Sequence, residues 1–92
     1  MVTNVLLLKT KDAGEVETVM GELMRMKGNI KPLLNISVNK NLRDTGFDII
    51  MTASYNSLTD MESYLKDPLH LEVAKNIGSK IEKQASACYE VN

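Results

Sequence analysis

The stretch FDIIMTASY, residues 47–55, shows the clearest strand pattern of the chain. Every second side chain is apolar and most of the intervening ones are polar, which is the period of an extended strand with one face on a core. This face is the most apolar in the chain. It is predicted to consist of Phe47, Ile49, Met51, Ala53 and Tyr55.

The residues after this strand predict a helix in two pieces. Ser57 followed by Asp60 has the spacing of a capping box at a helix start. Pro68 disfavours helical backbone at Asp67 and suits the first turn of a new helix, so the helix is expected to break there. The apolar residues expected to define the two pieces are Leu58, Met61, Tyr64 and Leu65 in the first, and Val73, Ala74, Ile77 and Ile81 in the second.

Residues 2–10, VTNVLLLKT, predict a central strand. The run is too short for a buried helix and is apolar on both faces, as expected of a strand that is covered on two sides. Its faces are predicted to be Asn4, Leu6 and Leu8 on one side and Val5 and Leu7 on the other.

From Asp12 onward the apolar residues take a helical spacing. Asp12 is a suitable N-cap with Glu15 three residues later, and Gly28 followed by Asn29 provides a left-handed stop. This amphipathic helix is predicted to turn Val16, Val19, Met20, Leu23 and Met24 inward.

Two more alternating stretches predict strands. LNISVN, residues 34–39, has one apolar face and suits a sheet edge, and QASACYEV, residues 84–91, alternates as a last strand would. The apolar faces are Leu34, Ile36 and Val38 in the first, and Ala85, Ala87, Tyr89 and Val91 in the second.

The β-α-β-β-α-β order predicts the α+β class with a ferredoxin-like fold, in which a four-stranded antiparallel sheet carries the helices on one face. The expected strand order, 4-1-3-2, places the two most apolar strands in the middle. Residues 1–92 are expected to form a single domain.

The sheet face away from the helices would be apolar and uncovered, which a monomer rarely tolerates. We therefore expect a homodimer that packs sheet against sheet, as a dimeric α+β barrel. The predicted interface residues are Val5, Leu7, Ile50, Ala87 and Tyr89, with Ala85 and Val91 on the same face.

Composition restricts the other partners. Eleven basic residues are scattered among twelve acidic ones, so no basic stripe for nucleic acid is present. The start lacks the pattern of a signal peptide, nothing suggests a membrane partner, and a lone Cys88, predicted to be buried, fits a reducing cytoplasm. With one histidine, one cysteine and no glycine-rich phosphate loop, neither a metal nor a cofactor is expected.

His70, the only histidine, is the candidate for chemistry. A base with the near-neutral reference pKa of histidine suits removal of a proton alpha to a carbonyl, and Tyr64 could stabilise the developing oxyanion. Alternatively, His70 hydrogen-bonds a backbone group or Asp67 at the helix break, and Tyr64 is a core residue. A pocket for a hydrophobic ligand, or a core filled by adaptable methionines, is expected among Asn4, Leu6, Met20, Met24, Met51, Tyr64 and His70.

Over nearly its whole length the chain resembles the stress-responsive α/β barrel domain family, abbreviated Dabb. The resemblance lies in VLLLKTK (residues 5–11), GFDIIMTASYNSLTDMESYLKDPLH (residues 46–70) and CYEV (residues 88–91). It implies a dimeric α+β barrel.

The family that the chain resembles includes the plant polyketide cyclase that makes olivetolic acid. Its acting tyrosine and histidine fall on Tyr64 and His70. The family often has histidines where this chain has Asn4 and Asp67, so chemistry that needs two imidazoles is excluded.

Three functions remain open from the sequence. The protein could bind a small hydrophobic ligand without catalysis, or act as a cofactor-independent cyclase or isomerase with His70 and Tyr64. If the cleft between helices and sheet is filled, a purely structural assembly unit follows.

Overall fold

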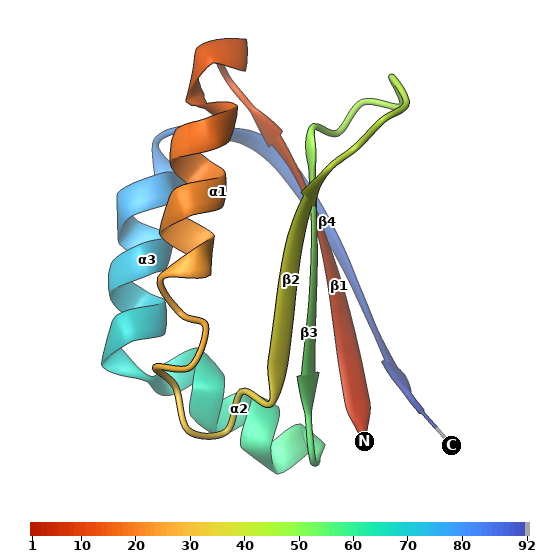
Figure 1. Ribbon diagram of the computed structural model, residues 1–92, viewed down its shortest axis with the longest axis vertical. Helices are drawn as coiled ribbons and strands as arrows, with labels where there is room; N and C mark the ends of the chain where they lie inside the picture. The colour runs from red at the N-terminus through yellow and green to blue at the C-terminus, as the bar shows by residue number, and fades with distance from the viewer. Residues whose placement is uncertain (92) are drawn as a thin grey trace.

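The sheet and the helices form two layers, seen from the side in Figure 1. The computed structural model describes residues 1–91. In chain order, the elements are β1 (Val2–Thr10), the 3₁₀ turn η1 (Ala13–Glu15), α1 (Val16–Met24), β2 (Asn35–Lys40), β3 (Ile49–Tyr55), α2 (Leu58–Lys66), α3 (Pro68–Gly78) and β4 (Ile81–Glu90).

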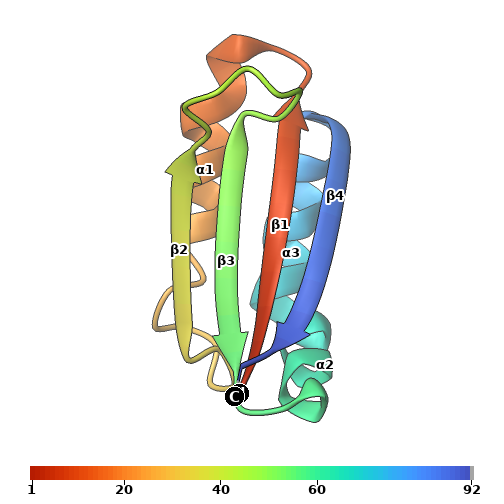
Figure 2. The ribbon, with the colours of Figure 1, turned by 90° about the vertical axis from the view of Figure 1, so that its right-hand side faces the viewer.

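The four strands pair in the order β2-β3-β1-β4, and every pairing is antiparallel. Figure 2 shows this sheet face on, with α1 behind β2 and β3 and with α3 behind β1 and β4. Leu6 of β1 lies opposite Met51 of β3 on one side and Ser86 of β4 on the other. The predicted α+β class, ferredoxin-like fold and strand order are confirmed.

The alternation in β3 is what builds the core. Ile49, Met51, Ala53 and Tyr55 are all buried, and the residues between them are half-buried. Phe47 lies just before the strand, where the Nζ of Lys83 sits 4.9 Å from its ring centre. The strand face predicted from period two therefore points at the helices.

The helix starts also follow the sequence signals. The Ser57 hydroxyl accepts a hydrogen bond of 3.1 Å from the backbone N–H of Asp60. The carboxylate of Asp67 accepts one of 2.8 Å from the N–H of Leu69, and Pro68 occupies the first turn of α3. The predicted break between the two helix pieces is confirmed at Asp67.

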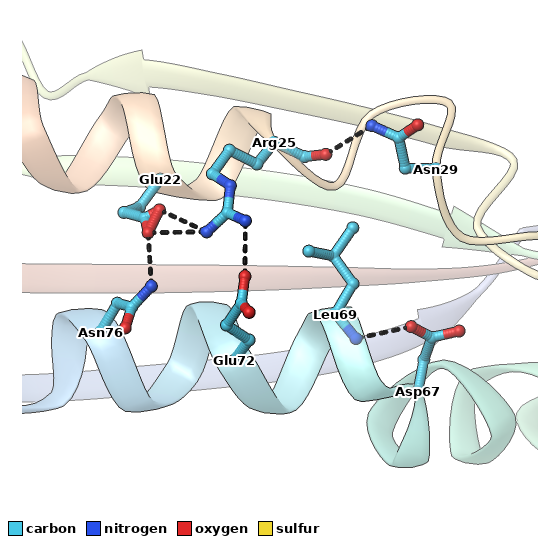
Figure 3. Close-up of polar contacts among 7 residues, drawn as sticks. All are labelled: Glu22, Arg25, Asn29, Asp67, Leu69, Glu72 and Asn76. Carbon is cyan, nitrogen blue, oxygen red and sulfur yellow. Dashed lines mark hydrogen bonds and ion pairs between the residues drawn. The ribbon is translucent and has the colours of Figure 1, made fainter.

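Polar side chains join α1 to α3 (Figure 3). The Arg25 guanidinium donates to both carboxylate oxygens of Glu22, at 2.9 and 3.0 Å, and to Glu72 at 2.5 Å. Asn76 donates to Glu22 at 2.7 Å. The hydrogen bonds from Asn76 and Arg25 hold the pKa of Glu22 below its ordinary value.

The first helix ends earlier than predicted. α1 stops at Met24, and the chain then continues to Asn29 in turns whose N–H groups bond three residues back. This tighter winding places Leu23 and Met26 on the same face, so Met26 is buried while Met24 is 38% exposed. The prediction that Met24 faces inward was wrong; Gly28 does adopt the predicted left-handed backbone, with φ 74°.

Other predicted inward positions are also exposed. Leu34 is exposed because the chain enters β2 with Leu33 buried instead, and Ala74 is exposed on α3. Ile81 belongs to β4 and not to the second helix piece. Cys88, predicted to be buried, is exposed because β4 is the outermost strand on its side. Leu58 and Leu65, two of the apolar residues predicted to define the first helix piece, are exposed on α2.

The sheet face opposite the helices carries the predicted apolar residues. In the register, Val5 lies beside Ala87, and Leu7 lies between Ile50 and Ala85. Towards β2 this face becomes polar, and the hydroxyls of Ser37 and Thr52 are joined by a hydrogen bond of 2.5 Å. Among residues 1–91, no helix has the length and apolar character needed to cross a membrane.

Candidate functional site

A cavity of about 590 Å³ lies between the helices and the β1–β4 side of the sheet. Strands β1 and β3 provide Asn4, Leu6, Leu8 and Met51, and β4 provides Ile81, Glu82, Lys83, Gln84 and Ser86. The rest of its wall comes from Leu23, Met26, Tyr64, Leu65, His70, Val73, Ala74, Ile77 and Gly78.

The cavity exists because of the residues that β4 turns toward the helices. Gln84 lies opposite Leu8, Ser86 opposite Leu6 and Cys88 opposite Asn4, and all three β4 residues are exposed. These side chains are polar or small, so they do not extend the apolar core beneath α3. The fold therefore leaves a partly apolar space with a polar edge.

Five of the seven residues predicted to surround a pocket do line this cavity. They are Asn4, Leu6, Met51, Tyr64 and His70. Met20 instead packs against the core outside the cavity wall, and Met24 is exposed on α1. Met24 lies outside the cavity because α1 ends there, and the tighter turns that follow bring Met26 to the wall instead.

His70 lies half-buried in the first turn of α3, directly after the break at Pro68. Its Nδ1 is 3.0 Å from the carbonyl oxygen of Leu65, the kind of backbone contact expected of a histidine with a structural role. A carbonyl oxygen only accepts, so Nδ1 carries the proton in this contact. In the neutral ring, Nε2 is then the acceptor.

Tyr64 is 3% exposed and lies next to His70, with 4.6 Å between the ring centres. Its hydroxyl donates to the sulfur of Met26 at 3.5 Å. Burial raises the pKa of Tyr64, so the phenol stays protonated at neutral pH. In this arrangement the phenol proton points to a sulfur atom and not to a carbonyl substrate.

Tyr55 also packs against Tyr64, with the ring centres 5.1 Å apart and the ring planes tilted by 51°. Its hydroxyl is buried and has no hydrogen-bond partner among the described residues. Burial, with a smaller effect from Tyr64, raises the pKa of Tyr55 strongly. The Tyr64 ring is thus in contact with both Tyr55 of β3 and His70 of α3.

The comparison with protein families now identifies the chain. Residues 2–91 match the model of the stress responsive A/B barrel domain, Dabb. The chain belongs to the Dabb family. The resemblance seen in the sequence is therefore confirmed over nearly the whole chain, although no curated protein matches it significantly.

Solved structures share the fold of this Dabb domain at low sequence identity. A dimeric protein of unknown function from Bacteroides fragilis is 22% identical, with a TM-score of 0.83 over 98% of this chain and 95% of the other. A Dabb protein from Mesorhizobium loti is 10% identical, with a TM-score of 0.87 over 99% and 96%. A hydroxynitrile lyase from Passiflora edulis is 17% identical, with a TM-score of 0.85 over 99% and 93%. At these identities the likeness shows the fold alone.

Several cavity residues of the Dabb domain escaped the sequence reasoning. The alternation of Gln84 and Ser86 with Ala85 and Ala87 placed the two polar residues on the helix side of β4. A polar residue on that side of the strand did not by itself indicate a pocket. Met26 was missed because it follows the end of α1. Within residues 1–91, no three side chains of the His, Cys, Asp and Glu types gather as metal ligands.

Proposed function

We propose that this Dabb protein binds a small, predominantly apolar molecule in the cavity between helices and sheet. The observation that carries the proposal is the cavity itself: about 590 Å³ is within the range of roughly 300–1,000 Å³ that is common for ligand sites. Most of its lining residues are apolar, and polar groups such as His70 and Asn4 are also at its wall. The open space argues against a filled cleft with a purely structural role.

Methionine methyl groups provide the test. Met51 lines the cavity and Met24 does not, so NMR shifts of the Met51 methyl should follow addition of 2-methoxynaphthalene while those of Met24 stay fixed. Ala74→Phe, which places a ring in the cavity, should abolish the response, and Lys75→Phe at an exposed neighbour outside it should not. Equal shifts at Met51 and Met24 would contradict binding in the cavity.

The second candidate is catalysis by His70 as a general base, with Tyr64 as partner. The observation in its favour is the Nδ1 contact with Leu65, which leaves Nε2 as the proton acceptor toward the cavity wall. A base acting on a ketone should speed exchange of alpha protons for deuterium. Exchange in 2-acetylnaphthalene should therefore be faster with the protein than with His70→Phe; equal rates would count against catalysis.

We also propose a homodimer that joins through the outer sheet face at Val5, Leu7, Ile50, Ala87 and Tyr89. The exposure of Tyr89, at 53%, and the apolar neighbours of Leu7 support it, as does the similarity to the dimeric Bacteroides fragilis protein. Leu7→Glu should convert a dimer into monomers in light scattering. Leu42→Glu, on a leucine that is 96% exposed in the β2–β3 loop, is the matched control.

We propose a cytoplasmic location as well. A free, exposed Cys88 is consistent with it, because thiols stay reduced in the cytoplasm.

A further inference from the structure

The hydrogen-bonding groups of the cavity differ in what they offer a ligand. His70 already uses its Nδ1 proton on the Leu65 carbonyl, at 3.0 Å. Its other ring nitrogen, Nε2, therefore acts as an acceptor when the ring is neutral. A ligand that reaches His70 must bring a proton of its own to form a hydrogen bond there.

Tyr64 has the same preference for a donor. Its hydroxyl proton is directed to the Met26 sulfur at 3.5 Å, and a thioether only accepts. The lone pairs of the phenol oxygen are what remains for a ligand. Both polar groups on the helix side of the cavity, His70 and Tyr64, therefore present acceptors.

The strand side presents donors. Asn4 carries an amide NH₂ and Ser86 a hydroxyl, and both line the cavity. Asn4 lies opposite Cys88 and Leu6 opposite Ser86, so Asn4 and Ser86 are diagonal neighbours on the same sheet face. Such neighbours lie about 7–8 Å apart, close enough for one ligand to reach either.

The charged side chains at the cavity do not single out an anion. Glu82 and Lys83 bring one charge of each sign to the wall, and Lys83 places its Nζ over the ring of Phe47, 4.9 Å from the ring centre. On the helix side a carboxylate ligand would meet two acceptors, His70 Nε2 and the Tyr64 oxygen.

We propose that the cavity selects uncharged apolar molecules that carry a hydroxyl group, which donates to His70 Nε2 and accepts from Asn4 or Ser86. The proposal rests on the ligand-binding function above and names its ligand class. A ketone or ether of the same shape can only accept, so it leaves Nε2 without a partner in the filled cavity. A phenol or alcohol pairs with both sides.

Three probes with one apolar body test this selection: 2-naphthol, 2-methoxynaphthalene and 2-acetylnaphthalene. At about pH 8, above the reference pKa of histidine, NMR titration of the Met51 methyl should give 2-naphthol an affinity about tenfold above the other two. In His70→Phe, which keeps a ring but removes the acceptor, the three affinities should converge. Ser86→Ala, at an exposed strand position, should weaken all three probes by at most a few-fold, because each probe oxygen can accept from Ser86, and 2-naphthol should keep its advantage.

The outcomes separate the two proposals. Equal affinity of the three probes for the wild type would overturn hydroxyl selection and leave ligand binding intact. If 2-naphthol keeps its advantage in His70→Phe, the assignment of the hydroxyl to His70 is wrong. If none of the probes shifts Met51, ligand binding itself fails, and hydroxyl selection fails with it.

Discussion

The two sides of the helix–sheet gap are built differently. Under α1, the sheet offers Ile36 and Ala53, which are 4% and 1% exposed, and the helix fills the space with Val19 at 0%. Under α3, β4 turns Gln84 and Ser86 toward the helix, and the cavity opens. The same fold thus contains a packed half and an open half.

The helices themselves are fixed across this boundary. Arg25 links Glu22 of α1 to Glu72 of α3 (Figure 3), so the wall of the open half is tied to the packed half. Helix α3 is also anchored in the core through Val73 and Ile77, which are 1% and 8% exposed. These contacts hold α3 in place over the open half.

The largest expected effect on stability comes from a substitution in the packed half. Ile36→Ala removes a buried side chain and should lower the free energy of unfolding by about 3 kcal/mol. Ile81→Ala, at a half-buried position in the cavity wall, should cost only about 1 kcal/mol because less apolar surface is lost. Urea denaturation measures both, and equal losses would show that the halves are packed alike.

The next largest effect comes from filling the cavity of the open half. Gln84→Leu combined with Ser86→Leu should extend the core under α3, raise the free energy of unfolding by about 1.5 kcal/mol and abolish probe binding. Thr59→Leu, on an exposed position of α2 outside the cavity, is the control and should change neither quantity. A double variant that still binds 2-methoxynaphthalene would show that the ligand lies elsewhere.

A smaller effect concerns the unpartnered hydroxyl of Tyr55. Tyr55→Phe should raise stability by about 1 kcal/mol, since it removes a buried polar group that lacks a hydrogen bond among the described residues. Because burial raises the Tyr55 pKa, the unfolded chain loses the phenol proton above about pH 10 while the folded chain keeps it, so the wild type loses stability as the pH rises further.

The matched control for this variant is Tyr89→Phe, on an exposed ring. Denaturation curves between about pH 8 and 11 should show a shallower alkaline loss for Tyr55→Phe than for the wild type. Tyr89→Phe should follow the wild type. A destabilised Tyr55→Phe would mean that the hydroxyl has a partner such as Tyr64 in solution.

The smallest expected effect concerns the polar contacts between α1 and α3 and is a change in the pKa of Glu22. Asn76→Ala should return the Glu22 pKa toward its ordinary value, because the first cause of its depression is lost. The depressed pKa stabilises the fold at neutral pH, and this contribution disappears as the pH falls through the folded pKa. Carboxyl NMR titration of Glu22 measures the shift, and Asn39→Ala, on an exposed position of β2, should leave it unchanged.

Local signals in the chain predicted most of the architecture. The alternation of β3, the Ser57 cap and the break at Pro68 each depend on neighbouring residues, so they were correct in the structure. The site was predicted less completely. Asn4, Tyr64 and His70 do line the cavity, whereas Met24 is exposed, because α1 ends at Met24 and the tighter turns that follow place Met26 at the wall.

The sequence by itself determined the order of strands and helices, because period, caps and proline geometry act over a few residues. It also supplied a single histidine, His70, close to Tyr64 in the chain. Only the tertiary structure decided that an open space lies between α3 and the β4 residues Gln84 and Ser86, and that the Nδ1 proton of His70 is already used. These features depend on contacts between distant segments, such as β1 with β4, which no local pattern records.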